Sequence, residues 1–362
     1  MPFTEISYYV FIDQSEPNSA TMTDSQNNDP QYDPATQEKL DAMLNGLYWW
    51  GVPTLFRCPH DPNPHNCDIA LVGVPHSTGN GTTERDQHLG PRAVRDVSAL
   101  GRRAHKVFGV DPWKQCRIHD LGDVALPEAN DNEASVQRMT DFYKRIDAAG
   151  TRPVSIGGDH AVTGGILQAI AGENAKLTGG KKVSLLHFDA HTDAFHHIEH
   201  FLGAKKSAAH WASYLVRDGH VDPHTSVQVG IRGNPRTLDW LEPSYDLGYE
   251  VVDIERYQEI GIEKTMEIID QRLGDNPVYI TFDLDCLDPT VAPGVANLEA
   301  GVEGLKINET MKMLRSVKGK NIIGGDVVCL MPTKDSPNKQ TSMVAMSLMF
   351  EMISLIADCI KS

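Results

Sequence analysis

The sequence predicts an α/β fold built on a mostly parallel, eight-stranded sheet. From residue 68 onward, short apolar runs rich in β-branched side chains alternate with longer segments of helical character. The eight runs expected to form strands are Ile69–Val74, Arg117–Leu121, Pro153–Ile156, Val183–Phe188, Ser226–Ile231, Tyr249–Ile254, Val278–Phe282 and Ile322–Val328. Repeated βα alternation predicts parallel strands covered by helices, but it does not separate a closed barrel from an open sheet.

Helices are expected between these strands, and the clearest are Ala134–Ala149, Ile262–Leu273 and Thr341–Ile360. Before the alternation begins, residues 13–37 are rich in Asp, Asn, Gln, Ser and Pro, a composition typical of a poorly packed tail. A short helix over Gln37–Leu47 is expected next, and a group of aromatic residues follows it: Tyr48, Trp49, Trp50 and Phe56. The aromatic group either covers the chain's own core or contacts a neighbouring subunit. We therefore divide the chain into a partly flexible N-terminal extension (1–65) and a main domain (66–362).

Composition excludes several classes of partner. The chain of 362 residues has a formal net charge of −16, which disfavours nucleic acid and anionic membranes as ligands. No uninterrupted apolar run approaches the ~18 residues of a membrane span, and the N-terminus lacks the basic-then-apolar pattern of a secretory signal. The six cysteines are scattered, which fits a reducing compartment. We expect a cytoplasmic protein that binds neither nucleic acid nor membrane.

Chemistry-bearing residues follow three of the predicted strands directly. The segments are Gly157-Gly158-Asp159-His160, Asp189-Ala190-His191-Thr192-Asp193 and Asp283-Leu284-Asp285-Cys286-Leu287-Asp288-Pro289. The carboxyl ends of strands are where α/β folds gather their ligands. Alternate residues of an extended chain point the same way, so Asp189, His191 and Asp193 can share one face, as can Asp283 and Asp285.

Four carboxylates and two imidazoles predict a pair of divalent cations. The carboxylates would repel one another strongly in a partly dry cleft, and two divalent ions would cancel their charge. Mixed carboxylate and imidazole ligation suits Mn²⁺, Fe²⁺, Co²⁺, Ni²⁺ or Zn²⁺ more than Ca²⁺. A single Asp after a strand often only caps a turn, and Asp159 and Asp288 fit that structural role. The predicted metal ligands are His160, Asp189, His191, Asp193, Asp283 and Asp285.

These segments resemble the signatures of the ureohydrolase family, which includes arginase and agmatinase. Further matching segments are Val72-Gly73-Val74-Pro75, Gly90-Pro91-Arg92, Gly230-Ile231-Arg232-Gly233 and Ala292-Pro293-Gly294, so the resemblance covers roughly residues 66 to 360. It is closer to the agmatinase branch than to arginase. It implies an open three-layer α/β/α sandwich, and it assigns the main domain as the catalytic domain.

The resemblance also implies two metal positions and a hydrolytic reaction. The implied ligand sets are His160 and Asp193 for one ion, His191 and Asp285 for the other, and Asp189 and Asp283 as bridges. In similar enzymes a bridging hydroxide attacks a guanidinium carbon, and urea and an amine are released. Asp193 is the expected proton carrier to the leaving amine. Mn²⁺ is the usual metal of the family, whereas the long N-terminal extension resembles the guanidine-hydrolase branch, for which Ni²⁺ is implied.

Substrate contacts are expected from two further segments. Glu299 lies in a loop that resembles the family loop whose glutamate pairs with the guanidinium group, and Asn297 precedes it. His210 stands where relatives carry a histidine, but Trp211 follows it in place of their glycine. Cys329 stands where many relatives place a glutamate, which implies a change in shape or polarity near the substrate. The expected catalytic residues are Asp193, His210 and Glu299, and the expected substrate contacts are Glu299, His210, Trp211 and Asn297.

The expected substrate is a small cationic guanidine compound: free guanidine, or a short N-alkylated guanidine or biguanide such as metformin. Neither the ammonium of agmatine nor the carboxylate of guanidinobutyrate finds an obvious partner in the sequence, and the apolar residues near the expected pocket favour a small ligand. Agmatinase or guanidinobutyrase is the alternative of the same class. A non-catalytic partner subunit of a hetero-oligomeric hydrolase is the alternative of another class. The resemblance further implies a trimer or hexamer, with a homologous partner subunit and metal-loading accessory proteins as open options.

Overall fold

The computed structural model describes residues 33–45, 47–80, 85–101, 103–196, 204–235 and 237–361. The chain separates into two compact units, Met1–Gly46 and Leu47–Ser362. In the first unit, helix α1 (Pro34–Asn45) begins three residues before the predicted helix, and the Asp33 carboxylate caps it by accepting two backbone N–H groups. Most of the predicted tail lies outside the described residues.

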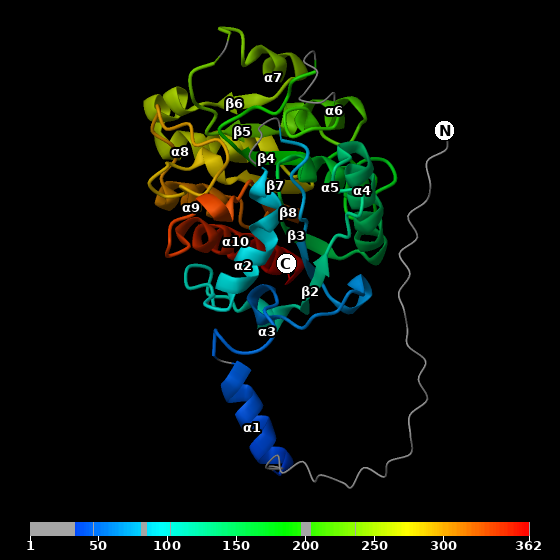
Figure 1. The fold of residues 1–362 in the computed structure, drawn as a ribbon. Helices are drawn as coiled ribbons and strands as arrows, with labels where there is room; N and C mark the ends of the chain where they lie inside the picture. The colour runs from blue at the N-terminus through cyan, green and yellow to red at the C-terminus, as the bar shows by residue number, and fades with distance from the viewer. Residues whose placement is uncertain are drawn as a thin grey trace, which may run out of the picture. The chain divides into compact units, whose positions relative to one another are not determined.

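All eight predicted strands are present in one sheet, which confirms the α/β prediction (Figure 1). The strands are β1 (Ile69–Gly73), β2 (Ile118–Asp123), β3 (Arg152–Ile156), β4 (Ser184–Phe188), β5 (Val227–Val229), β6 (Glu250–Val252), β7 (Val278–Asp283) and β8 (Ile322–Val328). Their order is β2-β1-β3-β8-β7-β4-β5-β6, and every neighbouring pair is parallel. Because β2 and β6 are edge strands, the sheet is open and not a barrel.

Helices cover both faces of the sheet and complete a three-layer sandwich (Figure 1). One layer contains α2 (Gly90–Ser98), α3 (Pro112–Gln115), α8 (Ile254–Leu273), α9 (Ile307–Ser316) and α10 (Gln340–Lys361). The other contains α4 (Asn132–Ala149), α5 (Ala161–Ile170), α6 (Trp211–Arg217) and α7 (Glu242–Leu247). This arrangement is the one the family resemblance implied.

Alternation along the strands supplies a separate core to each face. In β1, Ile69 and Leu71 belong to the apolar cluster under α8, α9 and α10, whereas Ala70 and Val72 belong to the cluster under α4, α5 and α6. Both faces are covered, so a central strand such as β1 is buried and apolar along its whole length.

The second unit begins earlier than the predicted boundary at residue 65. Leu55 and Phe56 are buried in the core, and the backbone N–H of Leu55 donates to Asp120 Oδ2 of β2 at 2.8 Å. The predicted aromatic group is therefore divided. Phe56 packs inside, whereas the side chains of Tyr48, Trp49 and Trp50 are 58%, 64% and 46% exposed.

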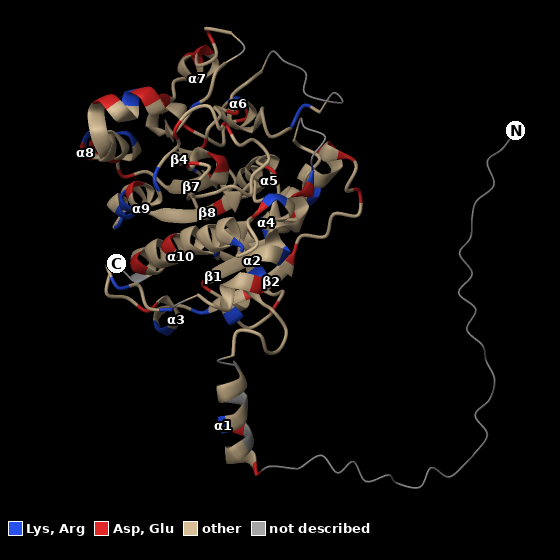
Figure 2. Ribbon diagram, turned by 60° about the vertical axis from the view of Figure 1, so that its left-hand side comes forward, with Lys and Arg blue, Asp and Glu red and all other residues tan. Residues whose placement is uncertain are grey.

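Helix α10 is the one helix among the described residues that could cross a membrane by length and composition alone. Figure 2 shows it in tan over most of its length, whereas both charge colours mark α8. Leu348, Met352 and Ile356 of α10 are fully buried, and the helix packs against β3 and β8. Its apolar composition is explained by this position over the middle of the sheet.

Candidate metal centre

The predicted ligands lie at the carboxyl ends of strands in the middle of the sheet. His160 follows β3, Asp189 follows β4, and Asp283 ends β7. In the sheet, β3, β8, β7 and β4 are consecutive neighbours. The chain therefore passes over β8 and β7 on its way from β3 to β4, and such a change in strand order is where open α/β sheets bind ligands.

A tight turn brings His160 to this edge. A Cβ atom on Gly158 would lie 1.6 Å from the backbone oxygen of His76, so only glycine fits there. The buried carboxylate of Asp159 accepts backbone N–H groups from Gly79, Asn80 and Ala161. Asp159 therefore has the structural role expected of it, and His160 follows directly at the start of α5.

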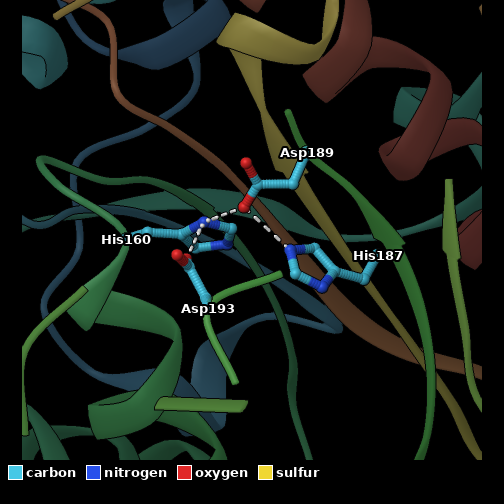
Figure 3. A group of neighbouring side chains, drawn as sticks. All are labelled: His160, His187, Asp189 and Asp193. Carbon is cyan, nitrogen blue, oxygen red and sulfur yellow. Dashed lines mark hydrogen bonds and ion pairs between the residues drawn. The ribbon is translucent and has the colours of Figure 1, made fainter. Parts of the chain in front are cut away.

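One group of ligand atoms surrounds the Nδ1 atom of His160 (Figure 3). Nδ1 lies 2.9 Å from Asp189 Oδ2 and 3.0 Å from Asp193 Oδ2. It also lies 3.3 Å from Oδ2 of Asp283. His187 lies on the other side of Asp189, with its Nε2 atom 2.9 Å from the same Oδ2 atom. One ligand atom from each of His160, His187, Asp189 and Asp193 lies within 4.8 Å of the others, and all four residues are buried.

A second group lies next to the first and shares Asp189 with it. His191 Nδ1 is 3.4 Å from Asp189 Oδ1 and 3.3 Å from Asp285 Oδ2. Asp283 connects the two groups, because its Oδ1 atom accepts the backbone N–H of Asp285 at 3.0 Å. The structure thus brings all six predicted ligands close together, whereas their division between two ions and the bridging role of Asp283 stay predictions. Their binding of metal ions stays a prediction.

The hydrogen-bond network of His160 fits a metal ligand. Thr281 donates its hydroxyl proton to the buried carboxylate of Asp326 at 2.7 Å, so it accepts a proton from His160 Nε2 at 2.8 Å. The Nδ1 atom is then the ring nitrogen that faces the three carboxylates, and it can hold either a proton or a cation there. A lone pair and carboxylates directed at one point suit a divalent cation.

Protons compete with cations for these atoms. Burial, and then the charges of Asp285 and Asp189, raise the pKa of Asp283 well above its ordinary value. Burial opposes protonation of His160, but hydrogen bonds with Asp189, Asp193 and Asp283 outweigh it and raise the pKa of His160 well above its ordinary value. The pKa of His191 is raised for the same reason, mainly by Asp285. A metal ion that binds these atoms would therefore have to displace protons.

Glu299 lies beside the second ligand group. Its Oε1 atom is 3.2 Å from His191 Nε2, and its side chain is 32% exposed. Its backbone has a φ of 44°, and a Cβ atom on Gly233 would lie 2.4 Å from Glu299 Oε2. A glycine at residue 233 therefore leaves room for the Glu299 carboxylate beside His191.

Buried Arg232 links the loop of Glu299 to the loop of the β7 ligands. The Arg232 side chain is 2% exposed, and its guanidinium donates to the backbone oxygens of Asp285, Leu287, Leu298, Glu299 and Val302. The planar guanidinium can reach several carbonyl groups at once because its donors form a fixed fork. Arg232 thus sets the position of Glu299 relative to Asp285.

The other predicted substrate contacts lie at different depths. His210 is buried at the start of α6, with its Nδ1 atom 2.7 Å from Ser207 Oγ. Trp211 is fully buried, and its indole Nε1–H donates to Asp193 Oδ2 at 2.8 Å. Asn297 is half-buried in the loop of Glu299. Contact of these residues with substrate stays a prediction.

Cys329 follows β8 in an unusual backbone conformation. Its φ is 67°, its side chain is 7% exposed, and its backbone N–H donates to Gly158 O at 2.7 Å. Burial raises the pKa of its thiol well above the ordinary value, and the nearby charges of Asp283 and Asp285 raise it further. A neutral thiol thus stands where a glutamate was expected from the family pattern.

His187 is a residue of the centre that sequence reasoning left without a role. Its Nδ1 atom accepts from Gln228 Nε2 at 3.0 Å, and Gln228 Oε1 accepts from Ser244 Oγ at 2.7 Å. His187 Nε2 therefore carries the proton that is donated to Asp189. Alternation along β4 puts His187 on the same face as Asp189. The sequence therefore indicated which way His187 points, but it did not indicate that Gln228 and Asp189 are its hydrogen-bond partners.

Comparisons with known proteins find a matching family and relatives that cover most of the chain. A sequence profile described as the Arginase family matches residues 67–354. Guanidinopropionase of Pseudomonas aeruginosa is 33% identical over 310 residues, covering 85% of this chain and 92% of that protein. Mitochondrial agmatinase of Gallus gallus is 33% identical over 306 residues, covering 84% and 86%. The structure of proclavaminate amidino hydrolase from Streptomyces clavuligerus has a TM-score of 0.78 and 27% identity, covering 86% of this chain and 99% of that one.

Proposed function

Because the chain belongs to the arginase family, we propose that it is a hydrolase with two divalent metal ions that cleaves a C–N bond of a small guanidine compound. The observation that carries the proposal is the pair of ligand groups that share Asp189, with Glu299 beside one of them. The products would be urea or a urea derivative, together with ammonia or an amine.

The side chains of the centre can divide the reaction between them. Two divalent ions bound here would supply Lewis-acid activation of solvent and stabilise negative charge. Glu299 accepts N–H groups of the guanidinium and fixes its plane beside His191. Asp193 accepts a proton from the attacking solvent molecule and passes it to the departing nitrogen, because an amine leaves only after gaining a proton. The solvent oxygen remains on the carbon, and the electron pair of the broken C–N bond leaves with the amine.

For the substrate we propose free guanidine, or a short N-alkylated guanidine or biguanide such as metformin. Buried Val295 in the loop of Glu299 and the neutral thiol of Cys329 support a small, weakly polar pocket. Agmatinase or guanidinobutyrase activity is the second candidate. The similarity to an agmatinase and to a guanidinopropionase supports that candidate comparably.

The proposed metals are Mn²⁺ and Ni²⁺. Imidazole and carboxylate ligands in one site accept both, and at a given site Ni²⁺ binds more tightly than Mn²⁺. The geometry of the ligand atoms does not favour one over the other. Metal identity is therefore tested together with the substrate.

A substrate panel tests the proposal. Metal-free protein is loaded with Ni²⁺ or Mn²⁺, and kcat/KM is measured for guanidine, metformin, agmatine, 3-guanidinopropionate and 4-guanidinobutyrate. We expect guanidine or metformin to be preferred. A tenfold or larger preference for agmatine or 4-guanidinobutyrate, about 1.4 kcal/mol of transition-state binding, would assign the second candidate, and the same preference for 3-guanidinopropionate would overturn both candidates.

The remaining proposals concern assembly and location. We propose a cytoplasmic trimer or hexamer in which exposed Tyr48, Trp49 and Trp50 contact a neighbouring subunit. If the purified chain binds two metal ions but releases no urea, amine or ammonia from any guanidine, it is the non-catalytic member of a hetero-oligomer and needs a homologous partner subunit. If it acquires Ni²⁺ in cells but not in purified form, metal-loading accessory proteins are required.

A further inference from the structure

Trp211 contacts the metal centre from the interior of the protein. Its indole Nε1–H donates to Asp193 Oδ2 at 2.8 Å, and the same oxygen lies 3.0 Å from His160 Nδ1. A neutral donor that does not titrate is thus bonded directly to an atom of the first ligand group. Charged ligands are oriented by such donors when the donor itself is held in place.

Packing holds the indole firmly. The ring centroid of Trp211 lies 4.8 Å from that of His160 and 4.9 Å from that of His187. A Cβ atom on Gly164 of α5 would lie 3.1 Å from Trp211 Cβ, so α5 passes close to the residue. The side chain has no exposed surface, which leaves no face for a substrate to touch.

The segment that carries Asp193 depends on the start of α6 for its shape. Asp193 has a φ of 49°, a conformation that is costly for a residue with a side chain. The backbone N–H of Ala212 donates to Asp193 O at 3.1 Å, and the N–H of Phe195 donates to Ala209 O at 3.1 Å. Helix α6 therefore fixes the backbone of Asp193, and Trp211 fixes its carboxylate.

We propose that Trp211 is a positioning residue, whose indole N–H orients the Asp193 carboxylate toward the metal position beside His160. The proposal rests on the proposed function, because it takes Asp193 to be a ligand and proton carrier. The sequence led us to expect that Trp211 contacts the substrate. In this proposal Trp211 instead contacts the ligand Asp193 from the interior of the protein. Loss of a partner that orients a ligand typically reduces metal affinity or activity about 10- to 100-fold.

The test compares Trp211→Phe, which keeps an aromatic ring and removes the donor, with Trp113→Phe. Trp113 is the matched control, because its indole Nε1–H donates to Cys58 Sγ at 3.2 Å in the opposite core cluster. Affinity for Mn²⁺ and for Ni²⁺ is measured by chelator competition without substrate, and tryptophan emission is recorded during the same titrations. We expect W211F to bind one of two ions about 10- to 100-fold more weakly and to lose an emission change that wild type and W113F retain.

Turnover adds a second readout. We expect W211F to lower kcat about 10- to 100-fold with KM within about threefold of wild type, and to add little to the loss already caused by Asp193→Asn. Unchanged affinity for both ions overturns the proposal. So does a raised KM with normal kcat, which would restore the substrate-contact role. If W211F does not fold, Trp211→Met, which fills an irregular space without an N–H donor, replaces it.

The two proposals can fail separately. If wild type turns over no guanidine compound, the proposed function fails, whereas metal affinity and emission still test Trp211. If wild type is active and W211F binds both ions normally, only the role of Trp211 is lost.

Discussion

In each of His160 and His187, a neighbouring side chain decides which ring nitrogen carries the proton. Thr281 accepts from Nε2 of His160, so Nδ1 is the ring atom that faces the carboxylates, and Gln228 makes His187 a donor to Asp189 by donating to its Nδ1 atom. A buried imidazole without such a partner could turn or change tautomer. Thr281 and Gln228, which are hydrogen-bonded to the imidazoles of the centre, therefore set the chemistry expected of these imidazoles.

Asp193 provides the sharpest test at this scale. Asp193→Asn keeps the shape of the side chain and removes its charge, so we expect the fold to persist. We expect the variant to lose most of the metal from one of the two positions and kcat to fall at least about 100-fold. Elemental analysis and steady-state kinetics measure the two effects. Asp141→Asn, on the exposed face of α4, is the control and should change neither. Near-normal turnover with two ions bound would falsify the assigned role.

Arg232 should affect substrate binding more than metal binding. Arg232→Lys keeps the charge but cannot reach the five carbonyl oxygens that the fork of arginine contacts, so the loop of Glu299 loosens. We expect KM for a guanidine substrate to rise about tenfold, with both ions retained. Arg138→Lys, in an exposed pair with Glu128, is the control. A fall in kcat at constant KM would show that Arg232 acts on the chemistry and not on the loop.

At the scale of elements, strands were more predictable than helix boundaries. Both faces of the sheet are buried, so central strands such as β1 and β7 are short, mainly apolar runs. The helix predicted over Ile262–Leu273 is part of α8 (Ile254–Leu273), in which Gly261 has φ 76° and ψ 173°. The sequence revealed the segment after this break, because a glycine with a positive φ interrupts the helical pattern.

Gly261 should therefore contribute to stability but not to activity. A Cβ atom there meets no atom within 4 Å, so Gly261→Ala tests backbone conformation alone. We expect a loss of about 1–2 kcal/mol in the free energy of unfolding, because an L-residue with positive φ is strained. Denaturant titration measures it, with Gly301→Ala as the control, since residue 301 also has free space and lacks a positive φ. Equal stability of both variants would mean that the α8 break relaxes without cost.

At the scale of the molecule, the sequence showed which residues follow the strands but not which distant segments meet them. Asp189, Asp283 and His160 were predictable because parallel strands bring their carboxyl ends to one edge. Arg232 and Trp211 act through atoms of loops and helices more than 15 residues away, as in the bond from Trp211 to Asp193. Contacts of this kind depend on how the helices pack on the sheet. The local pattern of apolar and polar residues does not predict that packing.

Metal ions should stabilise the whole catalytic unit. Ligands from three strands converge on the two groups, so ions that bind only the folded chain add RT ln(1 + [M]/Kd) to its stability, about 2.7 kcal/mol at 100 times Kd. We expect Tm to fall when a chelator removes the ions and to recover when Mn²⁺ or Ni²⁺ is restored. Asp193→Asn should recover only part of the shift. An unchanged Tm after verified metal removal would contradict a centre that joins the three strands.

Metal binding should also weaken as pH falls. The pKa values of His160, His191 and Asp283 are raised in the metal-free protein, so these groups hold protons below their raised pKa values, and an incoming cation must expel them. Each proton released makes affinity fall about tenfold per pH unit over the range in which the proton is bound, and affinity becomes independent of pH above that range.

Calorimetric titration with Mn²⁺ in two buffers of different ionisation enthalpy counts the protons, and we expect at least one to be released per pair of ions. His160→Asn should reduce that number, because it removes one of the groups that titrate. Because the raised pKa values arise from carboxylates gathered around each imidazole, binding heats that do not depend on the buffer would mean that those carboxylates lie further apart in solution than in this structure.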